Sequence, residues 1–381
     1  MNLHEFLDLL LRWVHLIAGI MWIGNSMLFN WLDRNLVDGR IWLLHSGGFY
    51  DVKKLMLEPN QMPAVLHWFK WQNGITWLSG ISLLVVVYYL QGGAFLVDPQ
   101  IARLHPGAAV AICVMFIVGA WLFYDLTWTA LEERPIAATV VSFVALGFIA
   151  WGLTRLLSGR AAFVHVGVIL GTLMTGNVWL HILPSQRELV AATEAGKPQD
   201  PALSARAKQR SIHNNYMTFP LLFIMISNHF PSTYADPRAW VILFVLMLAG
   251  AGVRHTMNVR FHYAYWLPWA LAIVTVATAL LFALTSHPAP TATGTASFSE
   301  VHGVIEQRCR PCHSAHPADT TFPAPPLGVT FDSPEQIGRM APRIGVRAVE
   351  QKSMPFMNKT QMTDGERALL ARWLASGAKL D

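Results

Sequence analysis

Residues 12–25 of the chain read RWVHLIAGIMWIGN, the middle of an apolar run over residues 8–32. A run of this length crosses the hydrocarbon core of a bilayer as one helix. Seven more apolar runs follow, near residues 71–91, 106–126, 136–157, 161–183, 214–230, 238–254 and 266–286. Hydrophobic residues make up 53% of the chain and the mean hydropathy is +0.37, values typical of a polytopic membrane protein. We therefore predict an all-α fold in which residues 1–286 form a transmembrane helical bundle of about eight spans in a lipid bilayer.

The basic residues predict how this bundle is oriented. Thirteen Lys and Arg residues lie in the odd-numbered loops, against five in the even-numbered loops and at the N-terminal edge. Because loops rich in Lys and Arg stay in the cytoplasm, we expect a bacterial inner-membrane protein with both termini in the periplasm. The first run has no preceding cationic segment and no small-residue cleavage site, so we expect it to remain as a span. The net charge of +5 arises mainly in these loops, and we expect no nucleic-acid partner.

A different motif follows the bundle, because residues 309–313 read Cys-Arg-Pro-Cys-His. Two cysteines separated by two residues and followed by histidine are the sequence of covalent haem attachment, in which the cysteines form thioethers and the imidazole binds the iron. A zinc site is disfavoured because the only other cysteine, Cys113, lies in an apolar run and no second pair completes a cage. We expect one haem c, attached to Cys309 and Cys312, with His313 as an axial ligand.

The sequence after this motif suggests the sixth iron ligand. Met354 and Pro355 precede a segment in which Thr363 and Glu366 open an amphipathic helix, as in a capping box. A Met-Pro pair before a closing helix resembles the class I cytochrome c pattern, in which a thioether binds the iron. We choose Met354 as the ligand, with Met357 or Met362 as alternatives.

These features divide the chain into three parts. Residues 298–381 resemble a small class I cytochrome c-like helical domain along their whole length, and residues 1–286 form the membrane domain. Residues 287–297 are rich in Pro, Ala and Thr, a composition that predicts a semi-extended linker.

Polar residues at membrane depth are costly and mark candidate sites. His213, Asn214 and Asn215 open the sixth run, and His229 closes it. His213 and His229 are about 24 Å apart along a helix, so they cannot bind one metal ion. Either imidazole could accept protons, and the amides could bind a polar ligand.

A histidine in the first run, His15, suggests a second cofactor. A b-type haem in the membrane domain needs two imidazoles at one depth, and His15 with His165 or His229 is the pairing available in the outer half of the bundle. The alternative is that each of these histidines only packs between helices.

Several of these segments resemble one family. Residues 12–24, residues 177–186, the segment from His213 to His229 and the fused cytochrome together resemble the bacterial membrane-bound urate oxidase (urate hydroxylase) family over nearly the whole chain. The resemblance implies oxidation of urate to 5-hydroxyisourate. Electrons would pass through the haem to a respiratory acceptor, such as a terminal oxidase or a soluble cytochrome.

The chemistry of urate suits the candidate residues. Urate is a planar monoanion, so a site needs amides for its edges, a cation and a proton acceptor. The candidate catalytic residues are His213, Asn214, Asn215, His229 and His15, and Arg254 or Arg260 could balance the charge.

Two other classes of function stay open. The spans could anchor an electron-transfer cytochrome that docks a quinol or a partner without oxidising purines. They could also form a purine transporter with an attached redox domain. Hydrolase and kinase functions are disfavoured because the sequence lacks a catalytic triad, a phosphate loop and a zinc-hydrolase signature.

Overall fold

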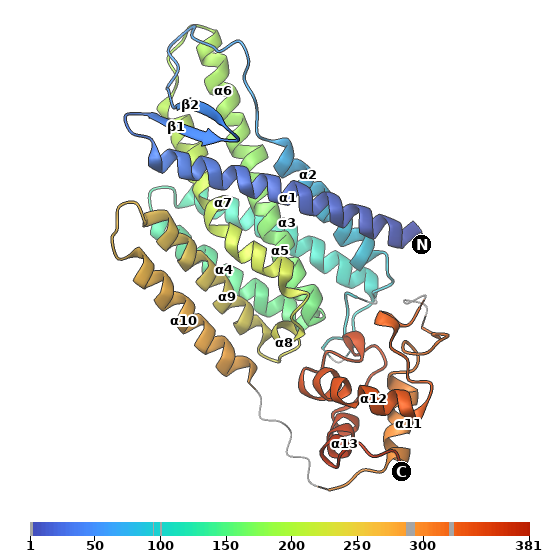
Figure 1. The fold of residues 1–381 in the computed structure, drawn as a ribbon. Helices are drawn as coiled ribbons and strands as arrows, with labels where there is room; N and C mark the ends of the chain where they lie inside the picture. The colour runs from blue at the N-terminus through green and yellow to red at the C-terminus, as the bar shows by residue number, and fades with distance from the viewer. Residues whose placement is uncertain (1–2, 94, 100, 287–293, 320–323) are drawn as a thin grey trace.

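The computed structural model describes the chain except residues 1–2, 94, 100, 287–293 and 320–323. The structure is mostly helical, with a bundle of long helices followed by a small module of short helices at one end of the bundle (Figure 1). Seven residues of the expected linker at 287–297 lie outside the described residues.

Six helical segments among the described residues are long and apolar enough to cross a membrane. They are α1 (Leu3–Asn35), α3 (Pro106–Ala130), α4 (Pro135–Leu156), the continuous α5 (Gly159–Gly176), η2 (Asn177–Ile182) and α6 (Leu183–Glu194), α9 (Ala239–Val259) and α10 (Trp266–Thr285). Many leucine, valine and phenylalanine side chains on α1 and α10 face outward. A lipid environment accommodates such a surface, because apolar patches of this extent are rare on soluble proteins.

Two further helices coincide with expected apolar runs but are not both long and apolar enough to count among these six. The helix α2 (Trp71–Leu84) is short and continues as a five-residue π-helix, η1 (Val85–Tyr89). The helix α7 (Pro201–Ser227) begins with a polar half that carries three Lys and Arg residues, and its last residues after Pro220 are apolar. The short α8 (Pro231–Tyr234) follows it.

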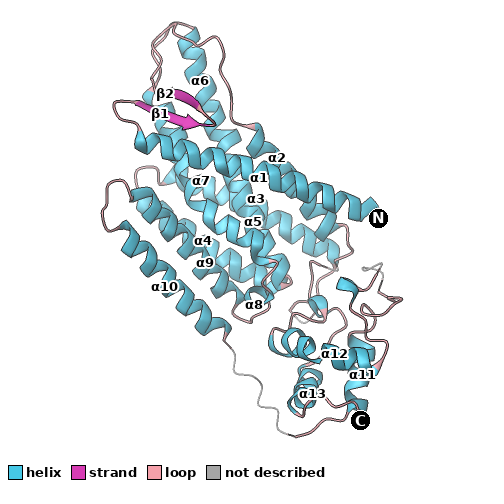
Figure 2. Cartoon of the chain, viewed as in Figure 1, coloured by secondary structure: helices cyan, strands magenta, loops and turns pink. Residues whose placement is uncertain are grey.

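The prediction of an all-α fold is wrong in one segment. Strands β1 (Arg40–His45) and β2 (Gly48–Lys53) pair antiparallel, with Leu43 opposite Tyr50 (Figure 2). Ser46 and Gly47 adopt positive φ angles of 49° and 79° between the strands. A two-residue turn of this kind matches the twist of a hairpin, and the branched and aromatic flanking residues favour strands.

The helix α5 lies at the centre of the bundle. Its side chains Phe163, Val166 and Ile169 are fully buried and pack against α3, α4 and α7. The β-hairpin and α6 extend from one end of the bundle, whereas the C-terminal module lies at the other end (Figure 1).

The C-terminal module consists of short, capped helices. They are α11 (Phe298–Arg308), η3 (Pro326–Gly328), α12 (Pro334–Ile344), η4 (Gly345–Glu350), η5 (Phe356–Asn358) and α13 (Asp364–Ala375). Capping boxes open α11, α12 and α13, so their first backbone N–H groups are satisfied. At α11, the backbone N–H and hydroxyl of Ser297 donate to Glu300, and these bonds hold the pKa of Glu300 below its usual value. Ile305, Ile337 and Trp373 form the centre of the module's own core.

Candidate functional site

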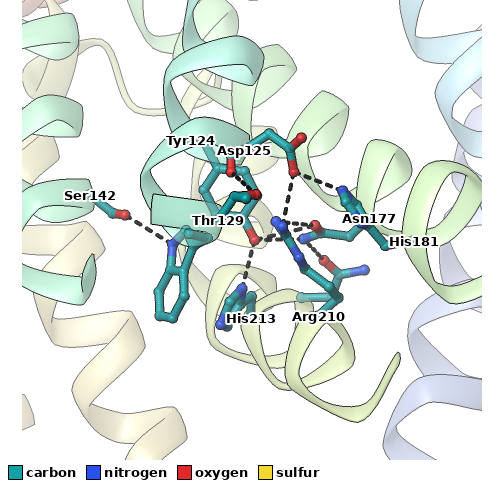
Figure 3. Close-up of polar contacts among 10 residues, drawn as sticks. Tyr124, Asp125, Thr129, Ser142, Asn177, His181, Arg210 and His213 are labelled. Carbon is teal, nitrogen blue, oxygen red and sulfur yellow. Dashed lines mark hydrogen bonds and ion pairs between the residues drawn. The ribbon is translucent and has the colours of Figure 1, made fainter. Parts of the chain in front are cut away.

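A partly buried polar network joins three helical segments at the end of the bundle that carries α6 (Figure 3). The helix α3 contributes Tyr124 and Asp125, and the π-helix η2 contributes Asn177 and His181. The helix α7 contributes its residues at positions 210, 213 and 214. These three α7 residues share one face of the helix, because side chains three and four positions apart are neighbours.

Amide and phenol groups form the centre of the network. The hydroxyl of Tyr124 and Nδ1 of His213 are 2.7 Å apart. Asn177 Nδ2 donates to the Tyr124 hydroxyl and to Asn214 Oδ1, each at 2.9 Å. Asn214 Nδ2 donates to the carbonyl oxygen of Met174 at 3.0 Å. Each amide is therefore fixed in orientation, and the network holds His213 in one position.

Charges lie on one side of this network. Asp125 Oδ1 is 2.9 Å from Arg210 NH2 and 2.7 Å from His181 Nε2. The guanidinium of Arg210 lies 5.4 Å from the centre of the Tyr124 ring, and its side chain is only 5% exposed. Because Asp125 pairs with Arg210, the buried cation is compensated within the protein.

His213 and Tyr124 also line a cavity of about 670 Å³ between α3, α4, α5, α7 and α9. Its polar wall includes Gln209, Tyr216 and His255, whereas most other lining residues are apolar. The centres of the Trp128 and His213 rings lie 3.8 Å apart. His213 therefore connects the fixed network to a space that can hold a ligand.

Asn215 faces a different group of residues. Its Oδ1 accepts hydrogen bonds from Arg254 Nε at 2.9 Å and from Asn258 Nδ2 at 2.8 Å. Asn215 is only 2% exposed, and its Nδ2 has no hydrogen-bond partner. Asn214 and Asn215 thus face different neighbours, because adjacent helix residues are about 100° apart.

The remaining candidate histidines lie elsewhere. His15 Nδ1 lies 2.9 Å from the carbonyl oxygen of Thr76 on α2, and His229 is exposed after the end of α7. Both ring nitrogens of His165 are engaged, Nδ1 with the Ala161 carbonyl and Nε2 with the Tyr89 hydroxyl. A haem held by His15 and His165 does not fit this arrangement, because an axial imidazole needs one free nitrogen.

The sequence did not single out Tyr124, although it supplies the hydrogen bond that positions His213. A tyrosine next to Asp125 near the end of an apolar run was the available signal. Within the described ranges, no three His, Cys, Asp or Glu side chains gather as a metal site.

The Cys-Arg-Pro-Cys-His segment forms the turn that ends α11. The backbone N–H groups of Cys312 and His313 both donate to the carbonyl oxygen of Cys309, at 3.2 and 3.0 Å. Burial raises the pKa of Cys309 to about 12 and also raises that of Cys312. Thiol–disulfide enzymes need a lowered thiol pKa, so these cysteines do not suit that chemistry.

The geometry of this turn fits a haem. His313 Nδ1 lies 3.1 Å from the carbonyl oxygen of Val329. A hydrogen bond at Nδ1 fixes the tautomer and leaves Nε2 for iron, as in other metal-binding histidines. Free Cys309 and Cys312 stand close together at the same turn, as two thioether bonds require.

The three candidate methionines have different environments. Met354 is half-buried at the edge of the module's core, and Met357 lies in η5 with a φ of 55°. Met362 is 1% exposed and packs inside the core. A loop position at the core edge suits an iron ligand, whereas Met362 suits core packing.

The Met354 loop is held by a buried arginine of α13. Arg367 NH1 donates to the carbonyl oxygens of Met354, at 2.7 Å, and of Ala348, and NH2 lies 3.4 Å from Asn358 Oδ1. Burial lowers the pKa of Arg367, and the carboxylate of Asp364 opposes this shift. The side chain ties together three segments on the same side of the module.

Comparisons with known proteins assign the helical bundle to a family. The family model described as Urate oxidase N-terminal matches residues 1–285, which include the polar network and the cavity. Searches of the curated proteins and of the solved structures gave no match. The family model covers about three quarters of the sequence, and the chain belongs to the urate oxidase N-terminal family.

Proposed function

We propose that the chain oxidises urate to 5-hydroxyisourate within the membrane and passes the electrons to a haem c in its C-terminal module. The match to the urate oxidase family over residues 1–285 is the observation that carries this proposal. The membrane domain spans the bilayer eight times, with α2–η1 and residues 214–230, which begin within α7, as spans beside the six more apolar segments. The excess of Lys and Arg in odd-numbered loops supports a periplasmic position for the module.

The cavity beside His213 is the proposed urate site. Its apolar and aromatic walls suit the faces of a planar ring, and the polar wall at Gln209, His213 and Tyr216 suits its edge. The half-reaction converts urate and water to 5-hydroxyisourate, two protons and two electrons.

His213 accepts one of these protons. The Tyr124 hydroxyl occupies its Nδ1, so Nε2 is the atom left for the substrate. Asn177 links the Tyr124 hydroxyl to Asn214 and so fixes the position of Tyr124 relative to α7. The Asp125–Arg210 ion pair adds a fixed electrostatic field beside them.

The C-terminal module would hold the haem through thioethers at Cys309 and Cys312, with His313 and Met354 as axial ligands. A bound haem c accepts one electron at a time, so each urate requires two transfers. Val329 orients His313, and Arg367 holds the Met354 loop.

The apolar lining of the cavity favours a second candidate, oxidation of a membrane quinol. A quinol has an apolar body and a polar hydroxylated ring, which also match an apolar pocket with one polar wall. In this function the spans feed the same haem without acting on purines.

Membranes that contain the protein separate the two functions. The c-type absorbance should become reduced on anaerobic addition of urate, and His213→Gln should slow this reduction at least a hundredfold. The matched variant His229→Gln, at the other end of α7, should change the rate little. Reduction by a quinol with no response to urate would replace the first function with the second.

A further inference from the structure

The C-terminal module contacts the membrane domain through Phe356, two residues after Met354. The centre of its ring lies 5.1 Å from that of Phe95 in an edge-to-face arrangement. The guanidinium carbon of Arg160 lies 5.7 Å from the same ring. Phe356 therefore meets both an aromatic and a cationic partner on the loop between η1 and α3 and at the start of α5.

The membrane-domain side of this contact is firmly held. The Ser158 hydroxyl donates to the Phe95 carbonyl oxygen at 3.2 Å, and Ser158 N donates to the Leu96 carbonyl oxygen at 3.0 Å. Arg160 Nε donates to Asn228 Oδ1 at 2.9 Å. The loop of Phe95 and the first turn of α5 thus form one platform, which we call the Phe95–Arg160 platform.

Aromatic rings continue from this platform into the bundle. The Tyr88 ring lies 6.5 Å from Phe95 and 6.1 Å from His165, and Tyr89 stacks on His165 at 5.8 Å. Tyr88 is 4% exposed. A continuous set of rings therefore leads from Phe356 to His165 in the first half of α5.

Charge also links the two sides of the contact. The carboxylate of Asp98, three residues after Phe95, acts electrostatically on Arg367 of the module. Arg367 is the side chain that holds the Met354 carbonyl oxygen at 2.7 Å. Removal of the Asp98 charge can therefore affect the arginine that holds the methionine loop.

We propose that the η5 turn with Phe356 is an intramolecular docking surface for the Phe95–Arg160 platform. Docking turns the Met354 side of the module toward the membrane domain and steadies the loop that carries this residue. The surface itself is independent of any cofactor. Its role in electron delivery rests on the proposed function.

Cross-linking tests the contact without haem reduction or substrate. In the full chain, Phe95→Cys with Phe356→Cys should be joined by a short bismaleimide, detected after cleavage of a protease site inserted in the linker. Phe95→Cys with Leu380→Cys is the matched control, since Leu380 is exposed near the end of the module. The first pair should give at least fivefold more joined product. Equal yields from the two pairs would overturn the proposal.

A second measurement tests the effect on the methionine loop. Asp98→Asn should shift the thioether-to-iron charge-transfer band or the haem potential, because it removes a charge that acts on Arg367. Phe356→Ala should slow substrate-driven haem reduction about tenfold. The loss is no larger because the linker still keeps the module near the membrane domain. Reduction by dithionite, which does not require docking, should be unchanged. If both variants bind haem but change neither the charge-transfer band, the haem potential nor the rate of haem reduction, the proposed effect of docking on the Met354 loop is wrong. Failure of urate to reduce the wild-type haem would count against the proposed function and leave the cross-link result intact.

Discussion

Replacement of Arg367 by glutamine should loosen the loop that carries Met354. The side chain is 6% exposed and donates to the carbonyl oxygens of Met354 and Ala348. A hydrogen bond from a charged donor contributes about 1.5–3 kcal/mol, and loss of one leaves a buried acceptor unsatisfied. Glutamine can keep one bond at most, so we expect a loss of about 3 kcal/mol in the free energy of opening this region. Since about 1.4 kcal/mol is tenfold in an equilibrium constant, amide exchange should accelerate roughly a hundredfold.

Hydrogen exchange of the full chain in detergent, followed by mass spectrometry, measures this effect in peptides from residues 346–362. Arg343→Gln is the matched control, because Arg343 is exposed on α12 and its loss should leave the same peptides unchanged. If the amide exchange rates of these peptides in the Arg367 variant are within threefold of those in the control, Arg367 does not hold the Met354 loop. Helices of the membrane domain serve as an internal reference, since neither substitution touches them.

Three further predictions concern ligands, protons and pH. Met354→Ala should abolish the thioether-to-iron charge-transfer band, whereas Met362→Leu should retain it, because Met362 packs in the core; visible spectra decide between them. His213→Gln should lower kcat for urate by at least about a hundredfold, the usual contribution of a general base, and His229→Gln should not; steady-state kinetics in membranes measure both. The lowered pKa of Glu300 means that its cap stabilises α11 above the unfolded pKa of about 4.3, and that this effect disappears as pH falls through the lower folded value. Exchange rates in α11 of wild type and Glu300→Gln should therefore differ at pH 6 and converge near pH 3.

The apolar runs predicted the positions of most of the long helices because a helix long and apolar enough to cross a membrane is specified by local composition. The helix α7 is the exception, since it begins at Pro201 with a polar half that precedes the apolar run expected at residues 214–230. The capping residues Thr363 and Glu366 likewise predicted the last helix, which the structure places at Asp364–Ala375. Hydropathy does not predict the β-hairpin, because its strands lie between two apolar runs. The sequence signal for it is the Ser46-Gly47 pair between two β-favouring segments.

The candidate site was only partly predictable. His213 and Asn214 stood out as polar residues in an apolar run, and the structure places both in one network. Tyr124, the partner of His213, comes from a helix about ninety residues earlier in the sequence, so only tertiary packing reveals it. His15 also stood out, but its close contact with Gly80, where an added Cβ would lie 2.9 Å from the ring, indicates helix packing.

Anaerobic titration of the purified full-length protein with urate, followed by visible spectroscopy, tests the central claim most directly. The account predicts that urate reduces the c-type haem, with two haems reduced for each urate consumed, because the oxidation releases two electrons. A haem that dithionite reduces but urate leaves oxidised at any concentration would contradict it.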